Sequence, residues 1–151
     1  MNVTFDELVF LAYVYARNSR APSSKGFSST AISPMVRSLV KRELVYVEEK
    51  IVTFTESSKI VYIVRPSRKL LVDIRNYNPA EVVAAFIRAG EEFVTDDSEL
   101  DSCLGCATQW IMHRCSKEHL AEFLASPFYT IRNVALQKIK NLPKRERIPF
   151  A

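Results

Sequence analysis

Glycine and histidine are scarce in this sequence. Its 151 residues include only three glycines, Gly26, Gly90 and Gly105, and two histidines, His113 and His119. Three glycines so far apart cannot form the Gly-rich loop whose backbone amides hold a phosphate group. Both histidines lie close to cysteines, so no separate Ser-His-Asp set can be assembled. These absences predict a protein that is not an enzyme and uses no cofactor.

A long apolar run is also missing. No stretch approaches the roughly 18 to 20 residues needed to span a bilayer, and the opening MNVTFDELVF lacks the basic start of a signal peptide. We therefore expect a cytoplasmic protein without membrane contact. Glutamine is rare too, with only two residues, which predicts a heat-adapted (thermophile) source because side-chain amides are labile at high temperature.

The composition is that of a folded chain with an uneven charge. Hydrophobic residues make up 48% of the sequence and charged residues 25%, far from the composition of disordered chains. Residues 1–75 hold 12 Lys and Arg against 7 Asp and Glu, whereas residues 76–151 hold 9 against 10. A basic front half suits a protein whose first part meets a polyanion.

Two helices are predicted in the front half. Thr4 and Glu7 form a capping box ahead of a helix over residues 4–16, and residues 18–29, rich in Ser, Gly and Pro, predict a loop. Ser33 before Pro34 predicts a second helix, to about residue 44. Its apolar face holds Met35, Val36, Leu39 and Val40, and its basic face holds Arg37, Ser38, Lys41 and Arg42.

After this helix the apolar residues alternate with a period of two. VYVEEKIVTFT predicts two short strands around a turn at residues 48–50. KIVYIV and KLLVDI predict further strands around a turn at residues 65–68. A small antiparallel sheet is therefore expected to follow the basic helix.

The back half is predicted to be helical. Asn78 caps a helix over residues 78–93. Residues 91–101 hold six acids and no base, a pattern typical of a solvated connection. Three more helices are expected over residues 102–115, 116–125 and 129–142, followed by a basic tail that frays.

Residues 33–57 resemble part of a winged helix-turn-helix domain. They read SPMVRSLVKRELVYVEEKIVTFTES, which is similar to the family's recognition helix, its exit into the first wing strand, and the second wing strand. The resemblance covers about residues 5–64. It implies that the basic helix enters the major groove of double-stranded DNA while the wing rides on the backbone.

The resemblance also implies which residues touch DNA. Arginine can bond both acceptors of a guanine edge, lysine supplies a point charge, and serine adds a short hydrogen-bonding arm. The implied contacts are Arg37, Ser38, Lys41, Arg42 and Lys50, the last at the wing tip, with Arg20 and Lys25 in the preceding loop as further candidates.

Two alternatives stay open for this lobe. Glu48 and Glu49 stand beside Lys50, and carboxylates suit a phosphate badly, so the same scaffold can serve protein contact in a non-enzymatic adaptor. Polar residues on the outside of an amphipathic helix are also what any solvated face looks like.

Residues 118–142 resemble one HEAT-type helical pair. They read EHLAEFLASPFYTIRNVALQKIKNL, with a Ser-Pro turn between two helices, and residues 82–93 and 104–112 are expected to form a second pair. The HEAT pattern is short and any helical hairpin needs such apolar residues, so a small helical bundle is favoured and HEAT-like pairs are the alternative. Either way, these helices are expected to offer a surface for a homodimer or a protein partner.

Cysteines and histidines gather in CLGCATQWIMHRCSKEH, residues 103–119. At this density thiolates and imidazoles are candidate ligands for zinc or an iron–sulfur cluster. On a continuous helix, however, Cys115 and His119 point away from the others, and a buried cysteine behaves as a small hydrophobe. Structural cysteines are favoured, with a metal site and a redox pair or disulfide as alternatives. The candidate metal ligands are Cys103, Cys106, His113 and Cys115.

Together these patterns predict an α+β protein with two lobes. A winged-helix-like domain with a small antiparallel sheet is expected over residues 1–76, and an all-helical domain, HEAT-like or a bundle, over residues 77–151. The predicted function is double-stranded DNA binding by a transcriptional regulator or a DNA-maintenance accessory.

Overall fold

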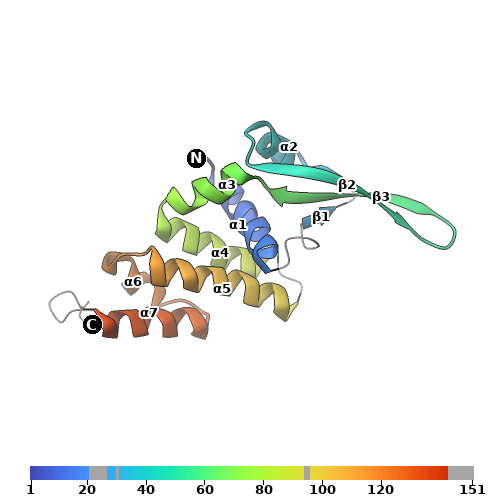
Figure 1. The fold of residues 1–151 in the computed structure, drawn as a ribbon. Helices are drawn as coiled ribbons and strands as arrows, with labels where there is room; N and C mark the ends of the chain where they lie inside the picture. The colour runs from blue at the N-terminus through green and yellow to red at the C-terminus, as the bar shows by residue number, and fades with distance from the viewer. Residues whose placement is uncertain (21–26, 30, 94–95, 143–151) are drawn as a thin grey trace.

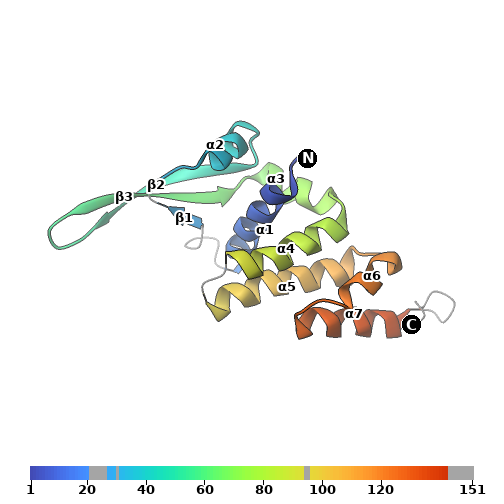
Figure 2. The same ribbon diagram turned by 180° about the vertical axis from the view of Figure 1, so that it is seen from behind.

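The computed structural model describes residues 1–20, 27–29, 31–93 and 96–142. It is a mixed α+β fold in which a three-stranded antiparallel sheet lies beside a larger helical body (Figure 1, Figure 2). The strands are β1 (Phe27–Ser29), β2 (Val45–Thr53) and β3 (Ser58–Pro66). The helices are α1 (Phe5–Arg20), α2 (Pro34–Lys41), α3 (Arg68–Asp73), the short η1 (Ile74–Asn76), α4 (Pro79–Glu92), α5 (Asp97–His113), α6 (Lys117–Phe123) and α7 (Tyr129–Asn141).

Helix α1 lies at the centre of the molecule and packs against β3, α4 and α5 (Figure 1). Its predicted capping box is confirmed: the Glu7 amide donates to Thr4 Oγ1 (3.1 Å) and the Thr4 amide donates to Glu7 Oε1 (2.9 Å). Every residue at positions 8–14 is buried. A helix that is apolar on all sides is one that is covered on all sides, which explains why its sequence shows only a weak helical period.

The sheet has the strand order β1-β3-β2, and both neighbouring pairs are antiparallel. The loop predicted over residues 18–29 is therefore wrong at both ends, because α1 continues to Arg20 and residues 27–29 form β1. This short strand pairs with residues 62–64 of β3. Beyond it, β2 and β3 continue as a two-stranded hairpin that projects from the body (Figure 1, Figure 2).

The turn predicted at residues 48–50 is also wrong. β2 runs unbroken, with Lys50 opposite Val61, and the chain turns at residues 54–57, where the Phe54 amide donates to the Ser57 carbonyl (2.7 Å). Residues 48–50 are polar, but none of them is a typical turn residue such as glycine, proline or asparagine. An exposed strand accommodates them.

The strand predicted for KLLVDI is wrong because these residues form α3 and η1. Ser67 caps α3 by accepting a hydrogen bond from the Leu70 amide (3.1 Å), and Leu70 and Ile74, four positions apart, are fully buried. Pro66 ends β3, so the predicted turn at residues 65–68 becomes a strand end followed by a helix cap. The apolar run fits a strand or a helix, and burial against the core selects the helix.

Helix α2 begins as predicted and ends three residues early, at Lys41. Ser33 Oγ accepts a hydrogen bond from the Val36 amide (3.2 Å), and Pro34 occupies the first turn. Val36 and Leu39 point into the core, whereas Val40, predicted on the same face, is 39% exposed.

A Schellman motif ends α2. The Leu44 amide donates to the Leu39 carbonyl (3.0 Å), and the Glu43 amide donates to the Val40 carbonyl (3.0 Å). Leu39 and Leu44 are both buried, which supplies the apolar contact that accompanies this motif. Glu43 holds a φ of 60°, the left-handed conformation in which glycine carries no steric cost.

The helices predicted in the back half are confirmed with shifted ends. Asn78 caps α4 by accepting a hydrogen bond from the Ala80 amide (3.0 Å). α5 begins at Asp97 rather than at residue 102, so part of the predicted acidic connection is helix. Asp96 caps it by accepting from the Glu99 amide (2.8 Å), and acidic residues in a first turn are favoured by the helix dipole.

One apolar core extends through both predicted lobes. The rings of Tyr15, Phe86 and Trp110, from α1, α4 and α5, meet with centroids 5.2 to 5.9 Å apart. Because α1 is shared in this way, the division into residues 1–76 and 77–151 stays a prediction, as does the choice between HEAT-like pairs and a bundle. None of the helices in the described ranges combines the length and apolarity that a bilayer crossing requires.

Candidate nucleic-acid interface

The exposed face of α2 carries two cations one helical turn apart. Arg37 and Lys41 are exposed, as the amphipathic pattern predicts, because Val36 and Leu39 turn the opposite face into the core. Within the part of the chain that the structure describes, neither side chain has a hydrogen bond or an ion pair. Their charges therefore face solvent.

Arg42 is held by the protein's own polypeptide. Its guanidinium forms an ion pair with Glu7, donates to the carbonyl of Asn2 (3.1 Å), and donates to Ser38 Oγ (3.0 Å). The hydrogen bond from Arg42 holds the pKa of the Glu7 carboxyl below its usual value. Arg42 and Ser38 thus fasten α2 to the start of α1, and we leave them out of the contact set proposed below.

Helix α3 adds a lysine beside the end of α2. The Lys69 ammonium donates to the Arg42 carbonyl (3.4 Å), and Ser67 Oγ donates to the Glu43 carbonyl (2.6 Å). Lys69 is exposed, so its remaining N–H bonds face solvent near Lys41. We call Arg37, Lys41 and Lys69 the basic surface. Sequence reasoning missed Lys69 because its segment was predicted to be a strand, although the Ser67 cap was a visible signal.

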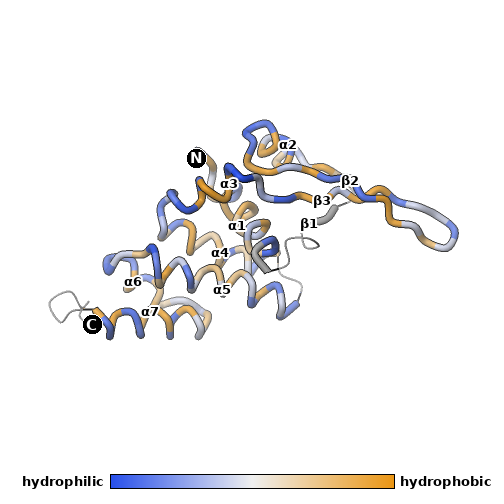
Figure 3. Tube along the Cα trace, viewed as in Figure 1, coloured by the Kyte–Doolittle hydropathy of each residue, from blue (hydrophilic) through white to orange (hydrophobic). Residues whose placement is uncertain are grey.

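The hairpin lacks the charge of a phosphate-binding wing. Lys50 lies in the middle of β2 and not at the tip, and the turn at residues 54–57 carries one charged residue, Glu56. Glu48 is paired with Arg65 (3.0 Å) and Glu49 is exposed. Apolar residues continue along the hairpin (Figure 3), and its exposed ones are Tyr46, Ile51, Phe54 and Ile60.

Two predicted contacts cannot be placed. Arg20 ends α1, but its side chain lies outside the described residues, and so does all of Lys25. The side chain of Arg17, one turn before Arg20, is largely buried. It forms an ion pair with Glu99 and donates a hydrogen bond to Tyr13 Oη (2.9 Å). This network joins α1 to the first turn of α5.

The three cysteines are buried and form no disulfide. Burial raises the pKa of Cys103 to about 12 and that of Cys115 to about 11, which keeps these thiols protonated and disfavours the thiolate that metal binding or nucleophilic attack requires. Among the described residues, no group of three or more His, Cys, Asp or Glu side chains is arranged to hold a metal ion. These observations favour the structural interpretation of the cysteines.

Compared with models of protein families, with curated proteins and with solved structures, the chain gives no match. Its function must therefore be inferred from the geometry of its own residues.

Proposed function

We propose that the chain binds double-stranded DNA through its front half, with α2 as the recognition helix of a winged-helix-like arrangement. The succession of a first helix, a short basic helix and a β-hairpin supports this proposal, because a winged helix uses such elements to fill the major groove and flank it. The family's usual helix ahead of the recognition helix is not among the described elements, and α2 follows residues 31–33 directly.

The observation that carries the proposal is the exposure of Arg37 and Lys41 without a counter-charge in the described part of the chain. Arg37 has the planar fork that bonds both acceptors of a guanine edge or two phosphate oxygens. Lys41 and Lys69 supply point charges for the neighbouring backbone. Glu43, also exposed at this end of α2, reduces the positive charge there and limits how much of the surface can face phosphate.

The proposal gives each part of the front half a role. Arg42 and Glu7 hold the C-terminal end of α2 against the start of α1, and Lys69 and Ser67 tie the same end to α3. A helix that reads base edges must be held rigidly, since discrimination depends on hydrogen-bond geometry. A regulator of transcription or an accessory of DNA maintenance fits this arrangement.

The test is the binding of a labelled DNA duplex at rising ionic strength, measured by fluorescence anisotropy. A protein that neutralises phosphates loses affinity steeply, with a slope of log K against log salt of about −0.9 for each phosphate contacted. Lys117→Ala, at an exposed lysine on α6, is the matched control and should bind like wild type. Weak binding that does not change with salt would contradict the proposal.

A non-enzymatic protein-interaction adaptor is the second candidate function, and the hairpin favours it. Ile51 and Ile60 are partners across the two strands and are 68% and 49% exposed, and Phe54, in the turn that follows β2, is 56% exposed. Exposed apolar groups on a projecting hairpin are costly in water and suit contact with another protein. If the duplex experiment fails, this surface becomes the leading site.

A further inference from the structure

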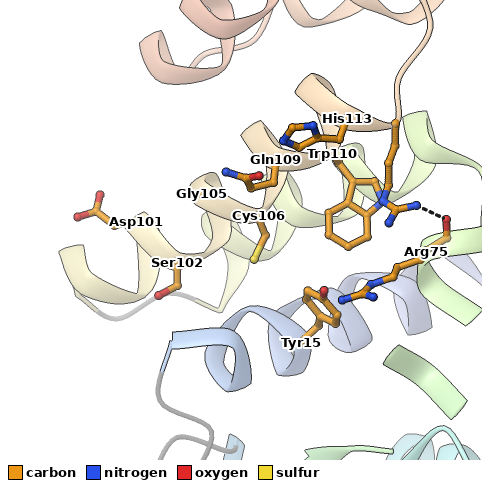
Figure 4. A pocket seen from close by; sticks show the side chains of 10 residues that line it. Tyr15, Arg75, Asp101, Ser102, Gly105, Cys106, Gln109, Trp110 and His113 are labelled. Atoms are coloured by element: carbon orange, nitrogen blue, oxygen red, sulfur yellow. Dashed lines mark hydrogen bonds between the residues drawn. The ribbon is translucent and has the colours of Figure 1, made fainter. Parts of the chain in front are cut away.

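A pocket of about 530 Å³ opens between α1, η1 and α5 (Figure 4). Ligand sites for small molecules commonly measure about 300 to 1,000 Å³, so this volume holds a molecule of nucleotide size. None of the residues that line the pocket belongs to the proposed DNA contacts.

One wall of the pocket is aromatic and firmly held. Tyr15 and Trp110 meet edge to face with centroids 5.5 Å apart, and Phe86 backs Trp110 at 5.2 Å. Trp110 is only 5% exposed, so its position is fixed by the core. A rigid aromatic wall favours a planar, ring-containing ligand. Such a ring buries apolar area and also gains from stacked or edge-to-face contact with the wall.

A glycine leaves room along this wall. Gly105 lines the pocket in the middle of α5, where glycine weakens a helix relative to alanine. A Cβ at this position would meet nothing within 4 Å, so core packing does not require glycine here. Gly105 is exposed, so the open space beside it faces the mouth of the pocket and the solvent.

Two arginines, Arg75 and Arg114, line the pocket, and Arg75 lies at the end away from Asp101 (Figure 4). Arg114 Nη1 donates to the Arg75 carbonyl (3.0 Å), and the Arg114 guanidinium lies 5.4 Å from the centre of the Trp110 ring. Neither arginine is paired with a carboxylate in the described ranges. The one acid that lines the pocket, Asp101, lies toward its other end (Figure 4). An anionic group is therefore favoured at the arginine end.

The indole N–H of Trp110 is a further sign of a ligand. It is buried and has no acceptor among the described residues, although buried donors are almost always satisfied. The Arg114 side chain lies over the same indole ring and lines the pocket with it. Because Arg114 is exposed, its side chain can shift to admit an acceptor oxygen.

We propose that this pocket binds a small aromatic anion, with the ring along Trp110 and Tyr15 and the anionic group on Arg75 and Arg114. A mononucleotide and an aryl carboxylate both have this chemistry. In either case one oxygen of the anion accepts from the Trp110 indole, and the remaining oxygens accept from the guanidinium groups.

Trp110 is the only tryptophan in the chain, so its fluorescence in the full-length protein reports on this pocket alone. The probes are AMP against adenosine, benzoate against benzamide, and inorganic phosphate by itself. We expect saturable quenching by AMP, by benzoate or by both, with at least about tenfold weaker binding of the neutral analogue, or about 1.4 kcal/mol. Which anion binds more tightly distinguishes the nucleotide from the carboxylate.

Variants separate binding from folding. Arg75→Gln and Arg114→Gln should each weaken the anion by about tenfold and leave the neutral analogue unchanged, whereas Arg88→Gln, at an exposed arginine on α4, should change neither. Gly105→Leu should block the pocket, and its far-UV circular dichroism checks the fold. The proposal is overturned if neither AMP nor benzoate quenches Trp110, if neutral analogues bind equally well, or if the two arginine variants bind like wild type.

Discussion

Helix α2 and the β2–β3 hairpin both stand at the surface of the front half, yet they offer opposite chemistry. α2 is anchored by buried Val36 and Leu39 and presents Arg37 and Lys41 to solvent. The hairpin is exposed along most of its length and presents apolar side chains between charges of both signs. The hairpin's three acids, Glu48, Glu49 and Glu56, balance its three bases, Lys50, Lys59 and Arg65, whereas the residues of α2 carry only positive charge. Under the proposed function, α2 meets nucleic acid and the hairpin is left for another contact.

The largest expected effect is on stability. Leu39→Ala should lower the free energy of unfolding by about 2 to 5 kcal/mol, because the Leu39 side chain is fully buried. Ile51→Ala on the hairpin should change it by no more than about 0.5 kcal/mol, since Ile51 is 68% exposed. Urea unfolding followed by circular dichroism measures both. Equal losses would mean that the hairpin is packed against another surface in solution, which would contradict the contrast between a buried α2 anchor and an exposed hairpin.

Charge reversal tests the same contrast in binding. Arg37→Glu should weaken duplex binding by about tenfold or more, or about 1.4 kcal/mol, because it replaces an attraction to phosphate or base edges with a repulsion. Lys50→Glu makes the same charge change on the hairpin and should cost less than about threefold. Fluorescence anisotropy at fixed salt compares the two. A larger loss for Lys50→Glu would assign phosphate contact to the hairpin.

A substitution by glycine should change the free energy of unfolding in opposite directions at the end of α2 and within the hairpin. Glu43→Gly should raise the free energy of unfolding by about 1 kcal/mol, because it relieves the left-handed φ of 60° that ends α2. Glu49→Gly, inside β2, should lower it by about 0.5 to 1 kcal/mol. Chemical denaturation measures both variants. A loss of stability in Glu43→Gly would show that the carboxylate has an energetic role that the backbone geometry does not reveal.

The smallest expected effect is the dependence of the α2 anchor on pH. The pKa of Glu7 is lower in the folded protein, so its ion pair with Arg42 stabilises the fold above the unfolded pKa of about 4.3. This contribution, under about 1 kcal/mol, is lost as pH falls through the folded pKa. Glu7→Gln and Arg42→Gln should each remove it, and the double variant should lose no more than either. Stability curves against pH that run parallel for wild type and Glu7→Gln would contradict this role.

The sequence predicted correctly those features of the fold that depend on residues close together along the chain. Side-chain caps at Thr4, Ser33 and Asn78 placed the starts of α1, α2 and α4 correctly, because each cap bonds an amide a few residues away. Ser67 gives the same signal for α3, but the alternating apolar residues before it favoured a strand. The length of β2 was missed because the polar residues 48–50 interrupt its alternating apolar pattern, and only pairing with β3 reveals one continuous strand.

The features of the candidate sites also fall into two groups: those set by local spacing and those that join residues far apart in the sequence. Exposure of Arg37 and Lys41 follows from helical spacing and was predictable. The pairing of Arg42 with Glu7 joins residues 35 positions apart, and the contact of Arg114 with Arg75 joins residues 39 positions apart. No spacing rule reaches so far along the chain. The pocket lined by Arg75 and Arg114, and the ion pair that removes Arg42 from the predicted DNA contacts, are therefore visible only in the fold.

The salt dependence of duplex binding by the double variant Arg37→Ala, Lys41→Ala, measured beside wild type, tests the central claim most directly. With each side chain neutralising one phosphate, the slope of log K against log salt should become less steep by about 1.8, twice the value for a single contact, while the Lys117→Ala control keeps the wild-type slope. Equal slopes for the double variant and wild type would contradict the claim that α2 meets DNA.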